Sequence, residues 1–137
     1  MKKYTDAVHE FHTAFKLGIK NTPTAHIGES RNLLRFNLMK EENEEYLEAA
    51  NNNDLVEVAD ALGDMLYILA GTIIEHGMQH KIDEVFDEIQ RSNMSKLGED
   101  GKPIYREDGK VLKGPNYSET NLETVLKFQS VYDRVIP

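Results

Sequence analysis

Two groups of carboxylates lie close together in the sequence. The first falls in KEENEEYLEAA, residues 40–50, and the second falls in LVEVADALGDMLYILAG, residues 55–71. The second group, Glu57, Asp60 and Asp64, interrupts a run that is otherwise nearly all apolar. A carboxylate inside a packed helix face is costly unless something neutralises it. Several converging carboxylates therefore predict a bound cation, and a hard divalent metal used in phosphate chemistry is the leading interpretation.

The candidate ligands limit the choice of metal, because all of them are oxygen donors. No His stands three positions after any of these acids, as the carboxylate-rich di-iron oxidases normally require. The chain contains no Cys and no HExxH motif, so a zinc site is also disfavoured. Oxygen-only ligation favours Mg²⁺, with Mn²⁺ as a possible substitute.

The second acidic group is predicted to lie on one face of a helix over residues 55–76. At 100° per residue its three acids fall within roughly a 60° arc, and apolar residues occupy most of the remaining circumference. A helix that is apolar nearly all round is a buried helix, so we expect the acidic stripe to face another element. Glu57 also stands three positions after Asp54, as in a capping box, but that role leaves Asp60 and Asp64 unexplained.

A preceding helix, predicted over residues 29–51, can supply the facing acids. The three asparagines at 51–53 form a short break, which favours an antiparallel pair of helices. Such a hairpin brings Glu42 and Glu45 opposite Glu57 and Asp60. We interpret Glu44 and Glu48, by contrast, as part of a solvated helix face.

The remaining elements complete a mainly helical chain. Apolar spacing predicts further helices over residues 4–17, 81–95 and 119–128. The stretch PIYREDGKVL, residues 103–112, predicts a β-hairpin turning at Asp108 and Gly109. The expected fold is therefore all-α, a bundle of four or five helices with a small C-terminal β-hairpin. We expect residues 1–137 to form a single domain.

Composition narrows the function further. The 137 residues are 39% hydrophobic and 29% charged, as is ordinary for a soluble globular protein. A net charge of −8 disfavours nucleic acid as a partner. No apolar stretch approaches the roughly 18 residues of a membrane span, and the N-terminus lacks the apolar core of a secretory signal. We therefore expect a cytoplasmic protein without membrane contact.

The two acidic motifs together resemble those of a known superfamily. The pattern EExxE followed by ExxD on successive helices is similar to the all-α nucleoside triphosphate pyrophosphohydrolases. These include MazG-like, phosphoribosyl-ATP pyrophosphohydrolase-like and dimeric dUTPase-like enzymes. The later segments RSNMSKLG and KGPNY look closest to the phosphoribosyl-ATP pyrophosphohydrolase-like branch. The resemblance covers roughly residues 30–117, and the matched acids are Glu41, Glu42, Glu45, Glu57 and Asp60.

The resemblance implies Mg²⁺-dependent cleavage of a nucleoside or deoxynucleoside triphosphate, or a related nucleotide, to a monophosphate and pyrophosphate. It also implies a homodimer or homotetramer whose site is partly built across subunits. Glu41 would be a further ligand or the base that prepares the attacking water. The implied metal ligands are Glu42, Glu45, Glu57 and Asp60, and the implied substrate contacts are Asn93 and Lys96.

Several alternatives stay open at this stage. The chain could instead be a non-catalytic helical module whose acidic groove takes a cation or a basic partner protein. The base, the sugar and the number of metal ions are not specified. For Phe11 and Phe15 a place in the core is favoured over a base-stacking platform. Ion pairs or surface positions are favoured over phosphate contacts for Arg31, Arg35, Arg91 and Arg106, and a part for Asp64 in the site is left open.

Overall fold

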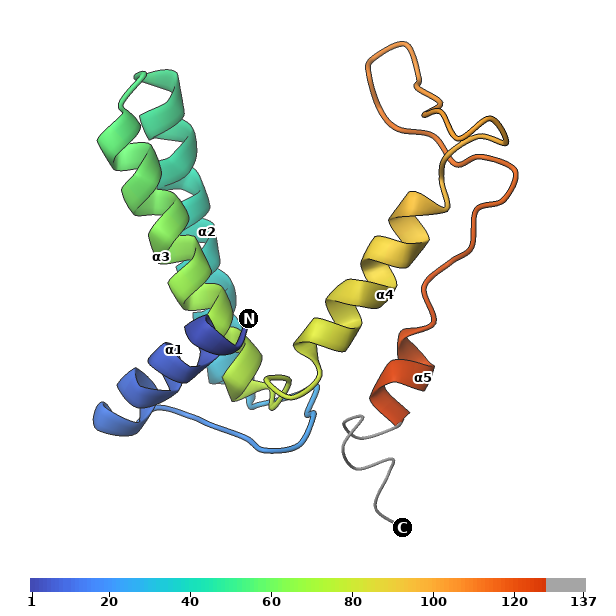
Figure 1. The fold of residues 1–137 in the computed structure, drawn as a ribbon. Coiled ribbons are helices and arrows are strands. Elements are labelled where there is room, and N and C mark those ends of the chain that lie inside the picture. The colour runs from blue at the N-terminus through green and yellow to red at the C-terminus, as the bar shows by residue number, and fades with distance from the viewer. Residues whose placement is uncertain (128–137) are drawn as a thin grey trace. The chain divides into compact units, whose positions relative to one another are not determined.

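Helices are the regular elements of the computed structural model, which describes residues 1–127. Within these residues five helices form and no strand does, so the all-α prediction is confirmed. The helices are α1 (Lys2–Ala14), α2 (Glu29–Asn51), α3 (Leu55–Glu75), α4 (Ile82–Met94) and α5 (Leu122–Lys127) (Figure 1).

The chain divides into two compact units, each of which is described by itself. The first unit is Met1–His80 and contains α1, α2 and α3 with both acidic groups. The second unit begins at Lys81 and contains α4 and α5. The expectation that residues 1–137 form a single domain stays a prediction.

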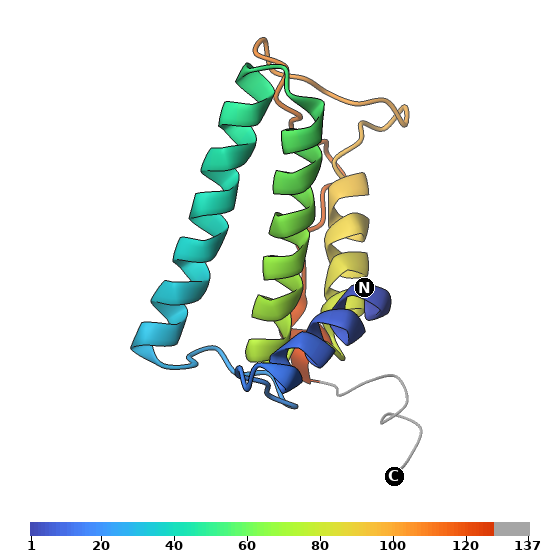
Figure 2. The same ribbon diagram turned by 90° about the vertical axis from the view of Figure 1, so that its left-hand side faces the viewer.

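In the first unit, α2 and α3 form a long antiparallel hairpin whose helices run side by side in both views (Figures 1 and 2). α2 spans the predicted residues 29–51. Asn53 then adopts the left-handed conformation, with φ of 52°, which asparagine tolerates better than most residues. The Asp54 side chain caps α3 by accepting a hydrogen bond from the Glu57 backbone N–H at 3.2 Å. This short, capped connection sets the two acidic groups on facing helices.

α1 packs against the C-terminal half of α3, at the end of the hairpin away from the α2–α3 connection (Figure 1). Val8 of α1 forms a buried core with Ala70 and Ile74 of α3. α1 ends at Ala14, three residues before the predicted end, because the chain turns through a left-handed Lys16 with φ of 58°.

The loop between α1 and α2 is fastened to the end of α3. The Lys20 backbone N–H donates to the Ile74 carbonyl at 3.0 Å, and the Thr24 N–H donates to the His76 carbonyl at 2.8 Å. Gly77 has φ of +69°, and a Cβ there would lie 2.1 Å from the Thr22 carbonyl oxygen. Only glycine fits this close approach, so the predicted stop of the third helix at Gly77 is confirmed.

The expectation that α3 is buried all round is wrong for its N-terminal half. Leu55, Val56 and Leu62 are 81%, 76% and 51% exposed. Within the first unit, α2 packs along this half and α1 packs against the other end of α3 (Figure 1). Within Met1–His80, α3 therefore presents apolar side chains that neither α1 nor α2 covers.

The predicted β-hairpin in the second unit is also wrong. A single antiparallel bridge joins Tyr105 and Val111, and no strand forms in the described residues. The turn itself forms, with Gly109 at φ of +87° and the Arg106 N–H donating to the Lys110 carbonyl at 2.8 Å. An isolated two-stranded hairpin is marginal without a third strand or a covering helix, which explains why the pairing stops at one bridge.

The C-terminal helix is shorter than predicted within the described chain. α5 begins at Leu122, and the predicted end at Phe128 lies outside the described residues. The Glu88 carboxylate of α4 accepts from the Asn121 backbone N–H at 2.9 Å, which ties the start of α5 to α4. None of the described helices is long and apolar enough to cross a membrane.

Candidate active site

An open cavity of about 390 Å³ lies at the connected end of the α2–α3 hairpin. Both helices contribute acids to its lining, and no Lys, Arg or His lines it. The cavity thus has the size and charge to gather cations around a phosphate chain. Its lining residues are Glu45, Glu48, Ala49, Asn52, Asp54 and Glu57.

Further along the same helices, Glu42 lies among other carboxylates. Burial raises the pKa of Glu42 to about 6. The hydrogen bond that protonated Glu42 donates to Glu45 raises this pKa further, and so do the charges of Glu45, Asp64 and Asp60. Burial, Asp60 and Glu45 likewise raise the pKa of Asp64. The acids of α2 and α3 therefore face one another as the sequence predicted, and Asp64 belongs to the same group.

The donors in this group fit a hard divalent ion. The Glu42 Oε2 atom is buried and has no hydrogen-bond partner. A buried, unpartnered carboxylate oxygen beside other carboxylates is satisfied either by a proton or by a metal ion. The surrounding acids are all oxygen donors, as Mg²⁺ and Mn²⁺ prefer.

The acids of α2 and α3 lie near one another, but their side chains do not form a complete metal coordination shell. Among residues 1–127, no three His, Asp or Glu side chains converge closely enough to hold an ion as they stand. Carboxylates repel one another when nothing neutralises them, so these side chains would turn toward an ion only on binding. Glu57 and Asp60 are exposed, so their side chains reach solvent.

Glu41 differs from the other matched acids. It is exposed on α2, and its charge acts with that of Glu44 on Lys40. The structure thus brings Glu42, Glu45, Asp60 and Asp64 together, and the acidic cavity brings Glu45 together with Glu57. Glu41 is not among the charges that act on Glu42 or Asp64.

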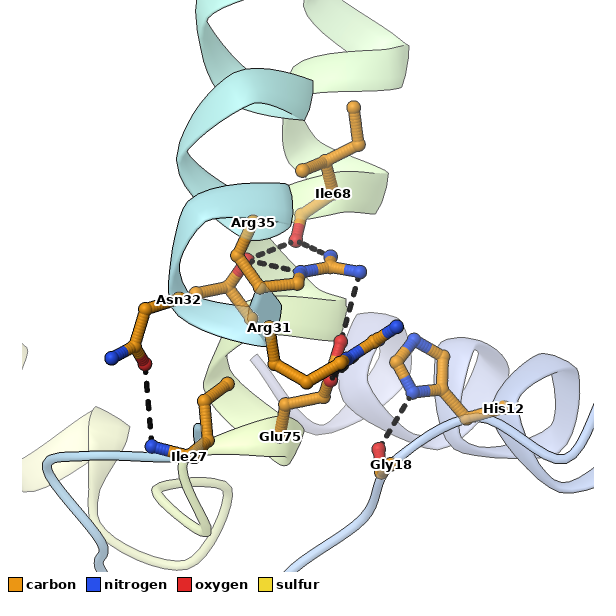
Figure 3. A network of polar contacts seen from close by, with 9 residues as sticks. His12, Gly18, Ile27, Arg31, Asn32, Arg35, Ile68 and Glu75 are labelled. Atoms are coloured by element: carbon orange, nitrogen blue, oxygen red, sulfur yellow. Dashed lines mark hydrogen bonds and ion pairs between the residues drawn. The ribbon is translucent and has the colours of Figure 1, made fainter. Parts of the chain in front are cut away.

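A network of ion pairs joins the other end of α2 to the end of α3 (Figure 3). Arg31 donates through Nε and Nη2 to Glu75 Oε1 at 2.9 and 2.6 Å, and Arg35 Nη1 lies 2.9 Å from Glu75 Oε2. Arg35 also donates to the Thr72 hydroxyl and the Ile68 carbonyl at 3.0 and 2.7 Å. The ion-pair interpretation of Arg31 and Arg35 is thus the one the structure supports.

Reasoning from the sequence missed Glu75, although a signal for it was present. Glu75 lies eleven positions after Asp64 and ends an apolar run, so it continues the acidic stripe of α3 by three helical turns. Gly71 lies on this stripe and lets the network close, because a Cβ there would lie 2.7 Å from Arg35 Nη2 and 2.9 Å from His12 Nε2.

Three aromatic rings gather where α1 meets α3, around Tyr67, which lies between Asp64 and Glu75 along α3. The Phe11 ring lies 4.4 Å from that of Phe15 and 5.5 Å, edge to face, from that of Tyr67, measured between centroids. Phe11 is 37% exposed, Phe15 is 64% exposed and Tyr67 is 43% exposed. The expected core role of Phe11 and Phe15 is therefore wrong. Tyr67 is one helical turn beyond Asp64, so the exposed rings lie beside the acidic group.

Comparison with known families agrees with the acidic motifs. The phosphoribosyl-ATP pyrophosphohydrolase family matches residues 8–93, which include every acid of the candidate site. The chain belongs to this family. Membership supports hydrolysis of phosphoric anhydrides as the activity.

The chain was also compared with individual solved structures and curated proteins. A solved structure from Exiguobacterium sp. 255-15, provisionally described as an NTP pyrophosphohydrolase, is 26% identical. The match covers 96% of this chain and 94% of that chain, with a TM-score of 0.46. No curated protein matches the chain.

The two predicted substrate contacts lie at the edge of the family match. Asn93 is its last residue and is exposed near the end of α4, and Lys96 follows in the turn after the helix. The Lys96 carbonyl accepts from the Gly114 N–H at 2.8 Å, which fixes the backbone of this turn. Both residues belong to the second unit, and their contact with substrate stays a prediction.

Proposed function

We propose that the protein is a Mg²⁺-dependent pyrophosphohydrolase of a nucleoside or deoxynucleoside triphosphate or a related nucleotide, with Mn²⁺ as a possible substitute. The observation that carries the proposal is the buried, unpartnered Glu42 Oε2 among acids of two facing helices. The membership of the chain in the phosphoribosyl-ATP pyrophosphohydrolase family supports the same class of reaction, hydrolysis of a phosphoric anhydride.

We propose two roles for the acids of the site: four of them bind the metal ion, and one accepts a proton from the attacking water. The proposed metal ligands are Glu42, Glu45, Glu57 and Asp60. These residues would hold a divalent ion, which would supply positive charge to the triphosphate and lower the pKa of the attacking water. Exposed Glu41, next to Glu42 in the chain but outside the clustered acids, is proposed to accept the proton of that water. Attack at the α-phosphorus breaks the α–β anhydride and releases a monophosphate and pyrophosphate.

The rings of Phe11, Phe15 and Tyr67 are proposed to receive the base of the substrate. Every nucleobase has a flat face that stacks on aromatic side chains. These rings are exposed and in contact with one another, and Tyr67 lies one helical turn from Asp64, which suits a base attached to a metal-held phosphate chain. Asn93 and Lys96 are proposed to add an amide contact to the base or sugar and a positive charge for the phosphates.

Assembly is the other part of the proposal. The exposed Leu55, Val56 and Leu62 on α3 suit burial against a second copy of the chain in a homodimer or homotetramer. Sedimentation equilibrium measures the mass directly. Leu62→Glu places a charge on this surface and should shift the protein toward monomer, whereas a wild-type protein that sediments as a monomer contradicts the assembly.

A hydrolysis panel tests the reaction. The protein is incubated with the canonical and deoxynucleoside triphosphates, dUTP and phosphoribosyl-ATP, with Mg²⁺, Mn²⁺ or EDTA, and the products are separated. We expect metal-dependent formation of monophosphate and pyrophosphate, reduced at least about 100-fold by Glu45→Gln or Asp60→Asn. Glu44→Gln is the matched control, since Glu44 pairs with Lys40 in solvent.

Two results would overturn the proposal. Diphosphate with orthophosphate as products would refute the cleavage position. Metal binding without turnover of any substrate would favour the non-catalytic helical module that binds a cation or a basic partner.

A further inference from the structure

A second cavity, of about 280 Å³, lies at the end of the first unit opposite the acidic cavity. The loop after α1, the start of α2 and the end of α3 form its walls. Arg31 lines this cavity and Glu45 lines the acidic one, and the two are fourteen positions apart on α2. They are therefore separated by roughly 20 Å along the helix, and the second cavity is not part of the acidic site.

The charge of this cavity is opposite to that of the chain as a whole. Lys16, Lys20 and Arg31 line it, and Glu75 is its one acid. Arg31 binds one oxygen of Glu75 and Arg35 binds the other, so the charge of this carboxylate is already balanced. A net positive cavity remains in a protein of net charge −8.

Two of the cations, Lys16 and Lys20, are exposed and have no partner among the described residues. Within residues 1–127, neither the Lys16 nor the Lys20 side chain makes an ion pair or hydrogen bond, whereas Lys2 pairs with Asp6. Arg31 gives one N–H from Nε and one from Nη2 to Glu75, which leaves three of its five N–H donors for another acceptor.

The backbone of the loop that carries these lysines is held in place before any ligand arrives. The Leu17 N–H donates to the His12 carbonyl at 2.8 Å, and the Lys20 N–H donates to the Ile74 carbonyl at 3.0 Å. A Cβ at Gly18 would lie 3.0 Å from Glu75 Oε1, so the loop approaches the ion pairs closely. The cost of ordering the binding groups is thereby reduced.

We infer that this cavity binds a small phosphate-class oxyanion with two or more negative charges, contacted by Lys16, Lys20 and Arg31. A lysine ammonium binds phosphate as a point charge, and three cations around one hollow suit a multiply charged anion. The volume is below the usual range for drug-sized ligands, and no aromatic side chain lines the cavity to stack on a base. The anion is either free pyrophosphate or the phosphate tail of a nucleotide.

Equilibrium dialysis of radiolabelled pyrophosphate in EDTA tests the inference. Without a divalent ion the acidic cavity repels the probe, so the two sites are separated and the result does not depend on the proposed function. We expect saturable binding that weakens by about tenfold or more in Lys16→Asn/Lys20→Gln, because two contact charges are lost. Asparagine suits position 16 because it tolerates the left-handed backbone there.

Two control variants and a competition experiment with ADP show which site and which anion the binding reports. Lys3→Gln/Lys110→Gln removes the same charge from exposed positions elsewhere and should leave binding unchanged. Glu45→Gln, in the acidic cavity, should also bind pyrophosphate normally. Competition by ADP as strong as by pyrophosphate would identify a nucleotide tail, and weaker competition would identify the free anion. No saturable binding to the wild type, or an equal loss in both double variants, would overturn the inference.

Discussion

Arg35 and Glu75 form an ion pair at 2.9 Å with both side chains nearly removed from solvent, at 8% and 2% exposed. Burial lowers the pKa of Arg35, and the charge of Glu75 opposes this shift. Because Arg35 also bonds Thr72 and Ile68, the pair fastens α2 to the C-terminal half of α3. The α2–α3 hairpin positions the acids, and this ion pair lies at the end of the hairpin away from the acidic cavity.

We expect Glu75→Gln to destabilise the protein strongly. Removing one partner leaves a buried, uncompensated guanidinium, which costs about 3–5 kcal/mol. Urea unfolding followed by circular dichroism measures the loss of unfolding free energy. Asp6→Asn is the control, because it breaks the exposed Lys2–Asp6 pair and should cost less than about 1 kcal/mol. Equal, small losses would show that the buried pair does not hold the hairpin.

The crowded Glu42 carboxyl predicts a pH dependence of stability in EDTA. Its pKa is raised from 4.5 to about 6 in the folded chain, first by burial and then by Glu45 and the neighbouring acids. The folded state therefore binds the proton more tightly than the unfolded state between these pH values. Stability should fall as pH rises from about 4.5 through about 6, by on the order of 1 kcal/mol.

Thermal unfolding at pH 5 and pH 7 in EDTA measures this difference. Glu42→Gln should remove most of the loss of stability, because its amide is neutral at both pH values. Glu44→Gln should leave the loss unchanged, since Glu44 is exposed and paired with Lys40. A pH dependence that is the same in wild type and Glu42→Gln would assign it to other groups.

Local sequence signals were sufficient to predict the helices that carry the site. The bounds of α2 followed from its apolar stripe and the asparagine break, and the start of α3 followed from the Asp54 cap. The pairing of Glu42 with acids of α3 followed from the short connection between the helices. Each of these features depends on residues that are close in sequence.

The failed predictions depend on what lies across space from a residue. Phe15 has helical apolar spacing yet is 64% exposed, because spacing does not say which face is covered. The exposed Leu55 shows the same limit on α3. Glu75 was missed because its partners, Arg31 and Arg35, lie at least forty positions earlier in the chain.

Asp64 and Glu41 are expected to act differently in the proposed site. Asp64 interacts with Asp60, Glu45 and Glu42, whereas Glu41 lies outside this group. Asp64→Asn should weaken Mn²⁺ binding by about 10- to 100-fold, as measured by electron paramagnetic resonance of the free ion. Glu41→Gln should bind Mn²⁺ normally but lose kcat. The reverse pattern would make Glu41 a ligand and remove Asp64 from the site.

The aromatic rings are expected to control nucleotide affinity rather than the chemical step. Phe15→Ala removes a ring that is 64% exposed and lies 4.4 Å from the Phe11 ring. Loss of one base-stacking contact costs about 1–3 kcal/mol, so KM for a nucleoside triphosphate should rise by roughly five- to 150-fold with little change in kcat. Phe36→Ala, which removes another exposed ring, from α2, is the control and should leave KM unchanged.

Inorganic triphosphate, which has no base, separates loss of base stacking from a general disturbance of the site. A Phe15→Ala variant that loses affinity equally for both compounds would show that the ring supports the fold and does not bind the base.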